Sequence, residues 1–362
     1  MRIIQATAYS ILCLLYISCN NNAQTNSPTT RISSTDSIST KGLDSGNPID
    51  FETTKVIRST YITDRNGADM RQSANKDAKR LGSYSFGTKL DVIEETDEWL
   101  GVCDRITRES IENGTDVETT QWEKVYVLKK QTGPMTEIGL LPADLNIITY
   151  LTENDKTESY EKGKPLNEYI KLEIIDEALY NSKKKSAVNF LLADTTVVKK
   201  KNGIIELKSE HKTARYVDKP EAEEDMQIFQ YLGQVDFLHQ YLITGSYWES
   251  LDYRFIDKTT GEETTTFGEY PNISADKKHI ISIYANPYEQ TADLSLYTIT
   301  NSNKIDDVMH TSFKNWMPSD ESTQLFWSRD GYFYAAVNHI NSYWKPDGSL
   351  NDKFQYIRIK VL

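Results

Sequence analysis

Apolar and polar residues alternate in short runs along most of the chain after residue 55. The run KLDVIEE at 89–95 alternates closely, Trp99 opens another run, and four longer segments after residue 194 each contain apolar runs around a turn. Alternation of period two between turn residues is typical of half-buried β-strands. The sequence therefore predicts a mainly β protein.

Two local patterns predict particular elements. Leu166, Ile170, Ile174 and Leu179 have helical spacing, which predicts a short helix leading into a strand. The segment IDKTTGE at 256–262 predicts a tight hairpin turn, with Gly261 in a left-handed bulge position.

The N-terminus has the layout of a secretion signal. In residues 1–19, Arg2 is followed by an apolar stretch and then by the small residue Ser18 before Cys19. Residues 20–54 are rich in Ser and Thr, with few large apolar residues, and are expected to form a disordered tether with a reach of about 30 Å.

The motif YISC at 16–19 is similar to the lipobox of bacterial lipoproteins. The resemblance implies that Cys19 is acylated, becomes the mature N-terminus and ties the chain to a membrane of the bacterial cell envelope, facing the periplasm. Cleavage with release into the periplasm or medium is the alternative.

Residues 55–148 resemble a bacterial SH3-like domain. The resemblance rests on ADMRQSAN at 68–75, RLGSY at 80–84, GTKLDVI at 87–93, WLGV at 99–102 and GLLPADL at 139–145. It implies a small barrel with a shallow groove that binds peptides or cell-wall fragments, lined by Trp99, Arg71 and Tyr84. Core packing of Trp99 and a strut role for Arg71 are the alternatives.

An insertion at 104–137 interrupts that domain. Its centre carries Asn113-Gly114, the strongest two-residue hairpin signal, which predicts a long β-ribbon.

Residues 160–362 are expected to form a second, larger antiparallel β domain. NISADKKHIISIY at 272–284 and FWSRDGYFYAAVNHI at 326–340 are similar to strand starts of periplasmic β-propellers. The available length suits about four or five blades, so the alternatives are a partial propeller and a meander sandwich.

Composition limits the classes of partner and the cysteine chemistry that the chain can have. The formal net charge of −12 argues against nucleic-acid binding, which requires a basic face. Of the three cysteines, Cys13 and Cys19 lie in the apolar N-terminal segment, which leaves Cys103 as a lone, buried and inert thiol.

No stretch carries a catalytic signature. The five histidines occur singly, and no phosphate loop or nucleophile elbow is present, so neither a metal nor a cofactor is expected. Several aromatic residues lie near strand ends, where they either stack on a ligand or pack across strands; these are Tyr247, Trp248, Tyr253, Trp316, Trp327, Tyr343 and Trp344.

The sequence thus predicts a lipid-anchored, non-catalytic binding protein of the cell envelope. Its expected partner is a cell-wall peptide, a glycan or an envelope protein. Two alternatives remain: a cell-wall hydrolase with acids in the C-terminal domain, and an inhibitor or immunity protein that neutralises a basic effector.

Overall fold

The computed structural model describes residues 46–362 except 113–114, 154–155, 160–164 and 223–224. The described residues belong to one compact unit. Antiparallel sheets dominate it, which confirms the mainly β class. Four features predicted from the sequence fall outside the described residues: the signal segment, Cys19, most of the tether and the Asn113-Gly114 turn.

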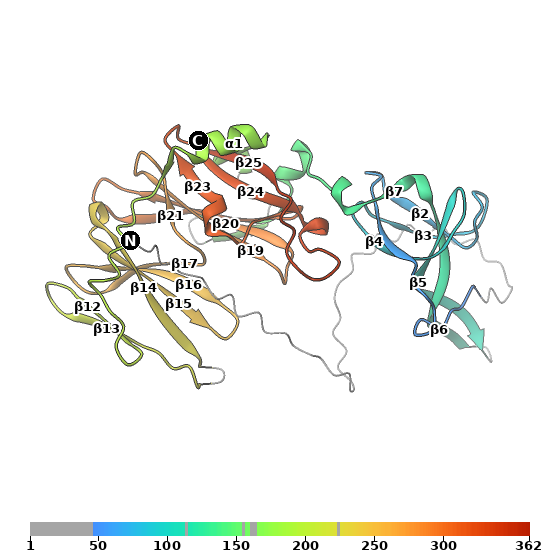
Figure 1. The fold of residues 1–362 in the computed structure, drawn as a ribbon, viewed down its shortest axis with the longest axis horizontal. Helices are drawn as coiled ribbons and strands as arrows, with labels where there is room; N and C mark the ends of the chain where they lie inside the picture. Colours follow the sequence, from blue (N-terminus) through green and yellow to red (C-terminus); the bar gives the residue numbers. More distant parts are fainter. Residues whose placement is uncertain (1–45, 113–114, 154–155, 160–164, 223–224) are drawn as a thin grey trace, which may run out of the picture. The chain divides into compact units, whose positions relative to one another are not determined.

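The first sheet contains seven strands in the order β3-β2-β6-β5-β4-β1-β7 (Figure 1). Its strands are β1 (Arg58–Ile62), β2 (Ala68–Arg71), β3 (Arg80–Tyr84), β4 (Lys89–Glu95), β5 (Trp99–Glu112), β6 (Thr115–Leu128) and β7 (Thr132–Gly133). The hydrogen-bonded order runs from β3 to β7 without closing into a barrel among the described strands.

The apolar residues that alternate with polar ones along these strands form the core of this sheet. In β4, Leu90 and Val92 are buried, whereas their neighbours in the strand are at least partly exposed. They pack with Val102, Val125 and other apolar residues of the facing strands. Strands β5 and β6 pair along their whole length, so the inserted segment continues the sheet as a two-stranded ribbon.

The segment before β1 also packs on this sheet, although residues up to 54 were expected to be tether. Pro48 pairs with Glu123 of β6, and Phe51 stacks on Trp122 with ring centroids 4.2 Å apart. The expected tether boundary was therefore too late, because Phe51 and Asn47 already contact β6.

Beyond residue 140 the described chain forms two six-stranded sheets, one four-stranded sheet and a two-stranded hairpin. The four-stranded sheet contains β14 (Gln227–Val235), β15 (Gln240–Tyr247), β16 (Leu251–Asp257) and β17 (Glu263–Phe267). The middle sheet contains β18 (Asn272–Ile273), β19 (His279–Asn286), β20 (Thr291–Ile299), β21 (Ile305–Phe313), β8 (Ile148–Glu153) and β9 (Lys156–Ser159). The third sheet contains β10 (Ile170–Ile175), β25 (Gln355–Val361), β24 (Phe333–His339), β23 (Leu325–Ser328), β11 (Ala187–Val188) and β22 (Trp316–Pro318).

The middle sheet is buried on both faces. Ile280 and Ile281 are adjacent in β19 and point to opposite faces, yet both are fully buried. Ile281 packs with residues of the third sheet such as Phe333, whereas Ile280 packs with residues of the four-stranded sheet such as Phe255. The three sheets therefore stack face to face.

The outer faces of the stack are covered by different elements. Helix α1 (Glu177–Lys184) places Tyr180 against Phe326 and Tyr334 of the third sheet. The hairpin of β12 (Ile204–Lys208) and β13 (Thr213–Val217) covers the four-stranded sheet through Ile205 and its apolar neighbours. Meander sheets stacked face to face correspond to the second of the two expected alternatives, the meander sandwich.

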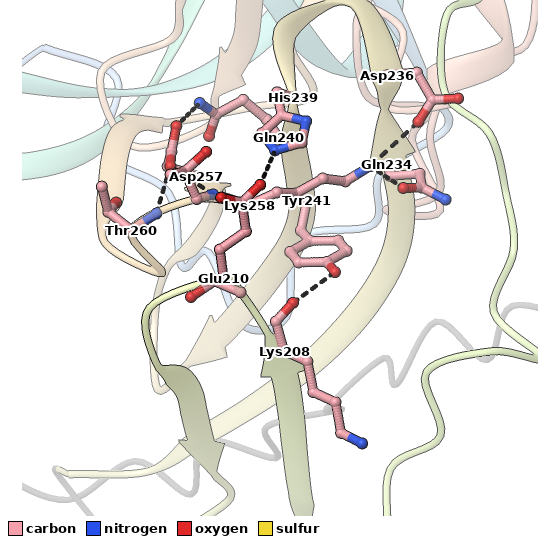
Figure 2. Close-up of polar contacts among 12 residues, drawn as sticks. Lys208, Glu210, Gln234, Asp236, His239, Gln240, Tyr241, Asp257, Lys258 and Thr260 are labelled. Carbon is pink, nitrogen blue, oxygen red and sulfur yellow. Dashed lines mark hydrogen bonds and ion pairs between the residues drawn. The ribbon is translucent and has the colours of Figure 1, made fainter.

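Polar contacts fix the hairpin to one end of the four-stranded sheet (Figure 2). The Lys258 amino group donates to Asp236 at 3.2 Å and to Gln234, and lies 5.2 Å from the centroid of the Tyr241 ring. The Tyr241 hydroxyl donates to the backbone carbonyl of Lys208 in β12 at 2.8 Å. These groups pair with one another, so the cluster has a structural role.

Two sequence expectations differ from the structure around residue 160. Residues 166–179 form a short 3₁₀ helix, Leu166–Glu168, then strand β10 and the start of α1. A short helix does lead into a strand, but Ile170 and Ile174 lie in β10, where a helix was expected. Leu140, Leu145 and strands β8 and β9 join the stack. The second region therefore begins before residue 160, and GLLPADL at 139–145 contributes to its core.

The turn at 256–262 is confirmed. Strand β16 ends at Asp257, β17 begins at Glu263, and Gly261 has φ +73°. The Asp257 carboxylate accepts the backbone N–H groups of Thr259 and Thr260 at 2.8 and 2.7 Å, which is typical turn chemistry.

The buried Glu123 side chain ties the start of the compact unit to β6. Its carboxylate is 0% exposed and accepts from the Arg108 guanidinium at 2.5 and 2.6 Å and from the Asn47 backbone N–H at 3.1 Å. Burial alone would raise the pKa of Glu123, but the hydrogen bonds from Arg108, Gln121 and Asn47 outweigh it and lower the pKa.

Glu123→Gln is expected to lower the free energy of unfolding by about 3 kcal/mol at pH 7, because it removes the buried negative charge that accepts two hydrogen bonds from Arg108. Because the folded pKa is lowered, the stabilisation is complete above the unfolded value of 4.5 and is lost as the pH falls through the folded value. Urea unfolding at pH 7 and pH 3.5 checks this, with the exposed Glu118→Gln in the same strand as control. A difference that does not shrink at the lower pH contradicts the assignment.

Candidate functional site

A groove of about 320 Å³ lies beside Trp99 in the first sheet. Residues of the β1–β2 turn, of β2 and β3, and of the ends of β5 and β6 line it. They are Asn66, Gly67, Ala68, Asp69, Arg71, Lys76, Arg80, Ser83, Trp99, Leu128 and Gln131. Three of these side chains are cationic and one is a carboxylate, in a chain whose formal net charge is −12.

Hydrogen bonds hold the cationic wall in place. The Arg71 guanidinium donates to the Ala78 carbonyl at 2.9 Å and to the Asp69 carboxylate at 2.5 Å. Arg80 donates to the other oxygen of Asp69 at 2.7 Å. Asp69 thus holds two arginines side by side, and Lys76 lies exposed in the turn between β2 and β3.

Gly67 shapes the turn at one end of the groove. Its φ is +77°, and a Cβ atom there would lie 2.3 Å from the backbone oxygen of Tyr84. Only glycine fits this close approach, so the turn can bring Asn66 and Ala68 to the groove.

Trp99 serves as both core residue and groove wall. It is only 6% exposed, and its backbone N–H donates to the Thr96 hydroxyl at 3.0 Å. An indole that is buried to this degree offers one edge to a ligand while the rest packs.

Tyr84 does not join the other two predicted site residues. It is buried in the core, does not line the groove, and donates its hydroxyl to Asp104 at 2.7 Å. Burial and the neighbouring Asp104 carboxylate raise the pKa of Tyr84 well above its usual range. The structure therefore brings together Trp99 and Arg71 and assigns Tyr84 to the core.

Sequence reasoning missed Lys76 and Arg80 as groove residues. Both belong to the stretch NKDAKR at 75–80, where the density of basic residues was the available signal. A short charged turn is usually only solvated surface, and the pairing of Arg80 with Asp69 depends on the register of β2 and β3.

A second cavity, of about 220 Å³, lies among connections of the stacked sheets. Its ionisable lining includes the carboxylates Glu269 and Asp320, and its aromatic lining consists of Tyr270, Tyr284, Tyr343 and Trp344. Tyr343 and Trp344 pack edge to face with ring centroids 5.3 Å apart. Both were among the aromatic residues noted from the sequence, whereas Glu269 and Asp320 were not.

The two carboxyl groups differ in their access to water, since Glu269 is partly buried and Asp320 is exposed. Burial raises the pKa of Glu269 against hydrogen bonds from the Tyr270 N–H and the Tyr253 hydroxyl. Burial and the neighbouring Glu321 raise the pKa of Asp320. Burial is the first cause of the raised pKa in both groups, so the protonated form of each is favoured relative to a fully solvated carboxyl group.

The third cavity, the free cysteine and the possible metal ligands give weaker indications of a functional site. A third cavity of about 420 Å³ is lined mainly by apolar residues such as Phe190 and Phe255. Cys103 is a partly buried free thiol whose pKa is raised by burial and by Asp91, which disfavours the reactive thiolate. Within the described ranges, no group of three His, Cys, Asp or Glu side chains could hold a metal ion.

No family model, no curated protein and no solved structure matches this chain. In the part of the chain that the structure describes, every helix is too short or too polar to span a bilayer.

The core role of Tyr84 gives a test. Tyr84→Phe is expected to lower the free energy of unfolding by about 1.5 kcal/mol, because it removes a hydrogen bond to a charged acceptor. Ligand binding in the groove should stay unchanged. Urea unfolding measures the loss, with the exposed Tyr288→Phe as control. A wild-type stability together with weakened binding would place Tyr84 in the site instead.

Proposed function

We propose that this protein is a lipid-anchored binding protein of the bacterial cell envelope. Its groove beside Trp99 binds an acidic group of a peptide, a cell-wall fragment or a protein partner, and leaves the ligand chemically unchanged. The observation that carries the proposal is the set of three cationic side chains, Arg71, Lys76 and Arg80, that line one groove in an acidic chain.

The groove suits a carboxylate more than a neutral ligand. Arg71 and Arg80 present planar guanidinium groups, which can donate two parallel hydrogen bonds to a carboxylate. Asp69 already takes one hydrogen bond from each arginine, so it positions them and cancels only part of their charge. The edge of Trp99 adds an apolar contact for the rest of the ligand.

A peptide segment with a free carboxylate meets these requirements. Cell-wall peptides carry such groups, and the resemblance of residues 55–148 to SH3-like domains supports the same class of ligand. The similarity of YISC to a lipobox supports an anchor at Cys19, which would hold the groove near the envelope.

The hydrolase alternative receives less support. Glu269 and Asp320 do line one cavity, but that cavity is separate from the groove that carries the proposal. No cysteine, serine or histidine arrangement in the groove supplies a nucleophile with a base.

Lys76→Glu tests the groove. It replaces an exposed cation, so the fold should be unaffected, and the affinity for isolated cell wall should fall about fivefold, because an exposed ion pair contributes up to about 1 kcal/mol. Co-sedimentation of the full chain with cell wall measures this at low and high salt.

Lys55→Glu makes the same charge change at an exposed position outside the groove and is the matched control. Equal losses for both variants would indicate a general charge effect. Absence of sedimentation for the unaltered chain would refute wall binding.

Cys19→Ser tests the anchor. If Cys19 carries acyl chains, the substitution should move the protein from the detergent phase to the aqueous phase in a phase-partition experiment. Cys13→Ser, in the same apolar stretch, should leave the partition unchanged. The mass of the mature N-terminus checks the result directly, and an unmodified Cys19 would contradict the anchor.

A further inference from the structure

The cavity that holds Glu269 and Asp320 has a lining of one charge. Two carboxylates and four aromatic rings line it, and the lining contains no Lys, Arg or His. No ion pair among the described residues involves Glu269 or Asp320. A cation that enters this cavity would therefore meet two carboxyl groups and no competing cation in the lining.

The cation in the lining of the neighbouring cavity, Lys184, interacts with other groups. Lys184 lines the neighbouring apolar cavity, which shares Tyr270, Asn272 and Leu325 with this one. Its amino group donates to the Gln324 side chain at 3.2 Å and lies 5.9 Å from the centroid of the Tyr180 ring. Lys184 is therefore not the counter-charge of Glu269 or Asp320, and that place is open to a cationic ligand.

The aromatic wall selects the kind of cation. Tyr284 is half-buried, Tyr343 is 5% exposed and Trp344 is 46% exposed, so the rings run from the interior to the mouth. Aromatic faces attract organic cations, most strongly when the site is desolvated. Glu269 already accepts the Tyr270 N–H at 2.9 Å and the Tyr253 hydroxyl, whereas a quaternary ammonium needs no acceptor and interacts with carboxylates and aromatic faces through its charge.

We propose that this cavity binds a small organic cation with a quaternary ammonium group. Such a group donates no hydrogen bonds, fills a volume of about 220 Å³ together with a short substituent, and places its charge between the carboxylates of Glu269 and Asp320 and the rings of Tyr343 and Trp344. The site is separate from the groove at Trp99 and does not depend on the function proposed for that groove.

Calorimetric titration of the full chain in a non-ionic polyoxyethylene detergent tests the proposal. Choline is the probe, and 3,3-dimethyl-1-butanol is its uncharged isostere of nearly equal shape. Choline should bind at least about tenfold more tightly than the isostere, because only the charge differs. N-acetylglucosamine tests the competing possibility of a sugar site.

Variants locate the binding. Glu269→Gln and Asp320→Asn should each weaken choline binding about tenfold, and Trp344→Leu should do the same without disturbing the core. Glu289→Gln and Trp248→Leu change exposed residues outside the cavity and should have no effect. Lys76→Glu should also leave choline binding intact, which separates this site from the groove.

Three results would overturn the proposal: no choline binding, equal binding of the uncharged isostere, or binding of the sugar alone. If Glu269→Gln fails to fold, Asp320→Asn and Trp344→Leu still decide the matter, since both residues are exposed at the mouth.

Discussion

The burial of the middle sheet on both faces is the constraint on which the C-terminal region depends. Ile280 and Ile281 are consecutive and both fully buried, so neither face of β19 can meet water. Each buried side chain of this size contributes about 1.5–3 kcal/mol only when another layer covers it. The middle sheet therefore needs a neighbour on each side, and those neighbours need covers of their own. The series ends where α1 and the β12–β13 hairpin, which expose polar residues outward, close the two outer faces.

The connections between strands of the stacked sheets line the cavity that contains Glu269 and Asp320. The chain passes from the four-stranded sheet to the middle sheet through Glu269 and Tyr270, and between strands of the third sheet through Asp320. These connecting residues line one cavity although they are distant in sequence. Glu269 is partly buried because the layers that flank it must pack, so its desolvation is a consequence of the stack rather than of a local motif.

The local sequence pattern was sufficient to predict most strands, but it was insufficient to predict which residues those strands bring into contact. KLDVIEE at 89–95 and the Gly261 turn could be predicted because alternation and turn chemistry act within a few residues. Ile170 and Ile174 misled because a spacing of four places residues on one face of a strand as well as of a helix. Trp99 and Arg71 could be placed by motif, whereas Tyr84 could not be assigned to the core without knowing that Asp104 of β5 lies within hydrogen-bond distance. The acids Glu269 and Asp320 carried no signal, because only the stacking of sheets brings them to one cavity.

The groove and the cavity have opposite charge in the same chain, and local charge decides what each can hold. Charges further apart than the Debye length of about 10 Å at 0.1 M salt are largely screened, so a net charge of −12 spread over the chain does not override three cations in one groove. The groove is open and its Lys76 is exposed, so the binding of acidic groups that we propose for it should weaken with salt. Glu269 is only partly exposed and has no cationic neighbour in the cavity wall, so its attraction for a cation is screened less. Two ligands of opposite charge can therefore be held by one chain, each chosen by the few side chains within reach.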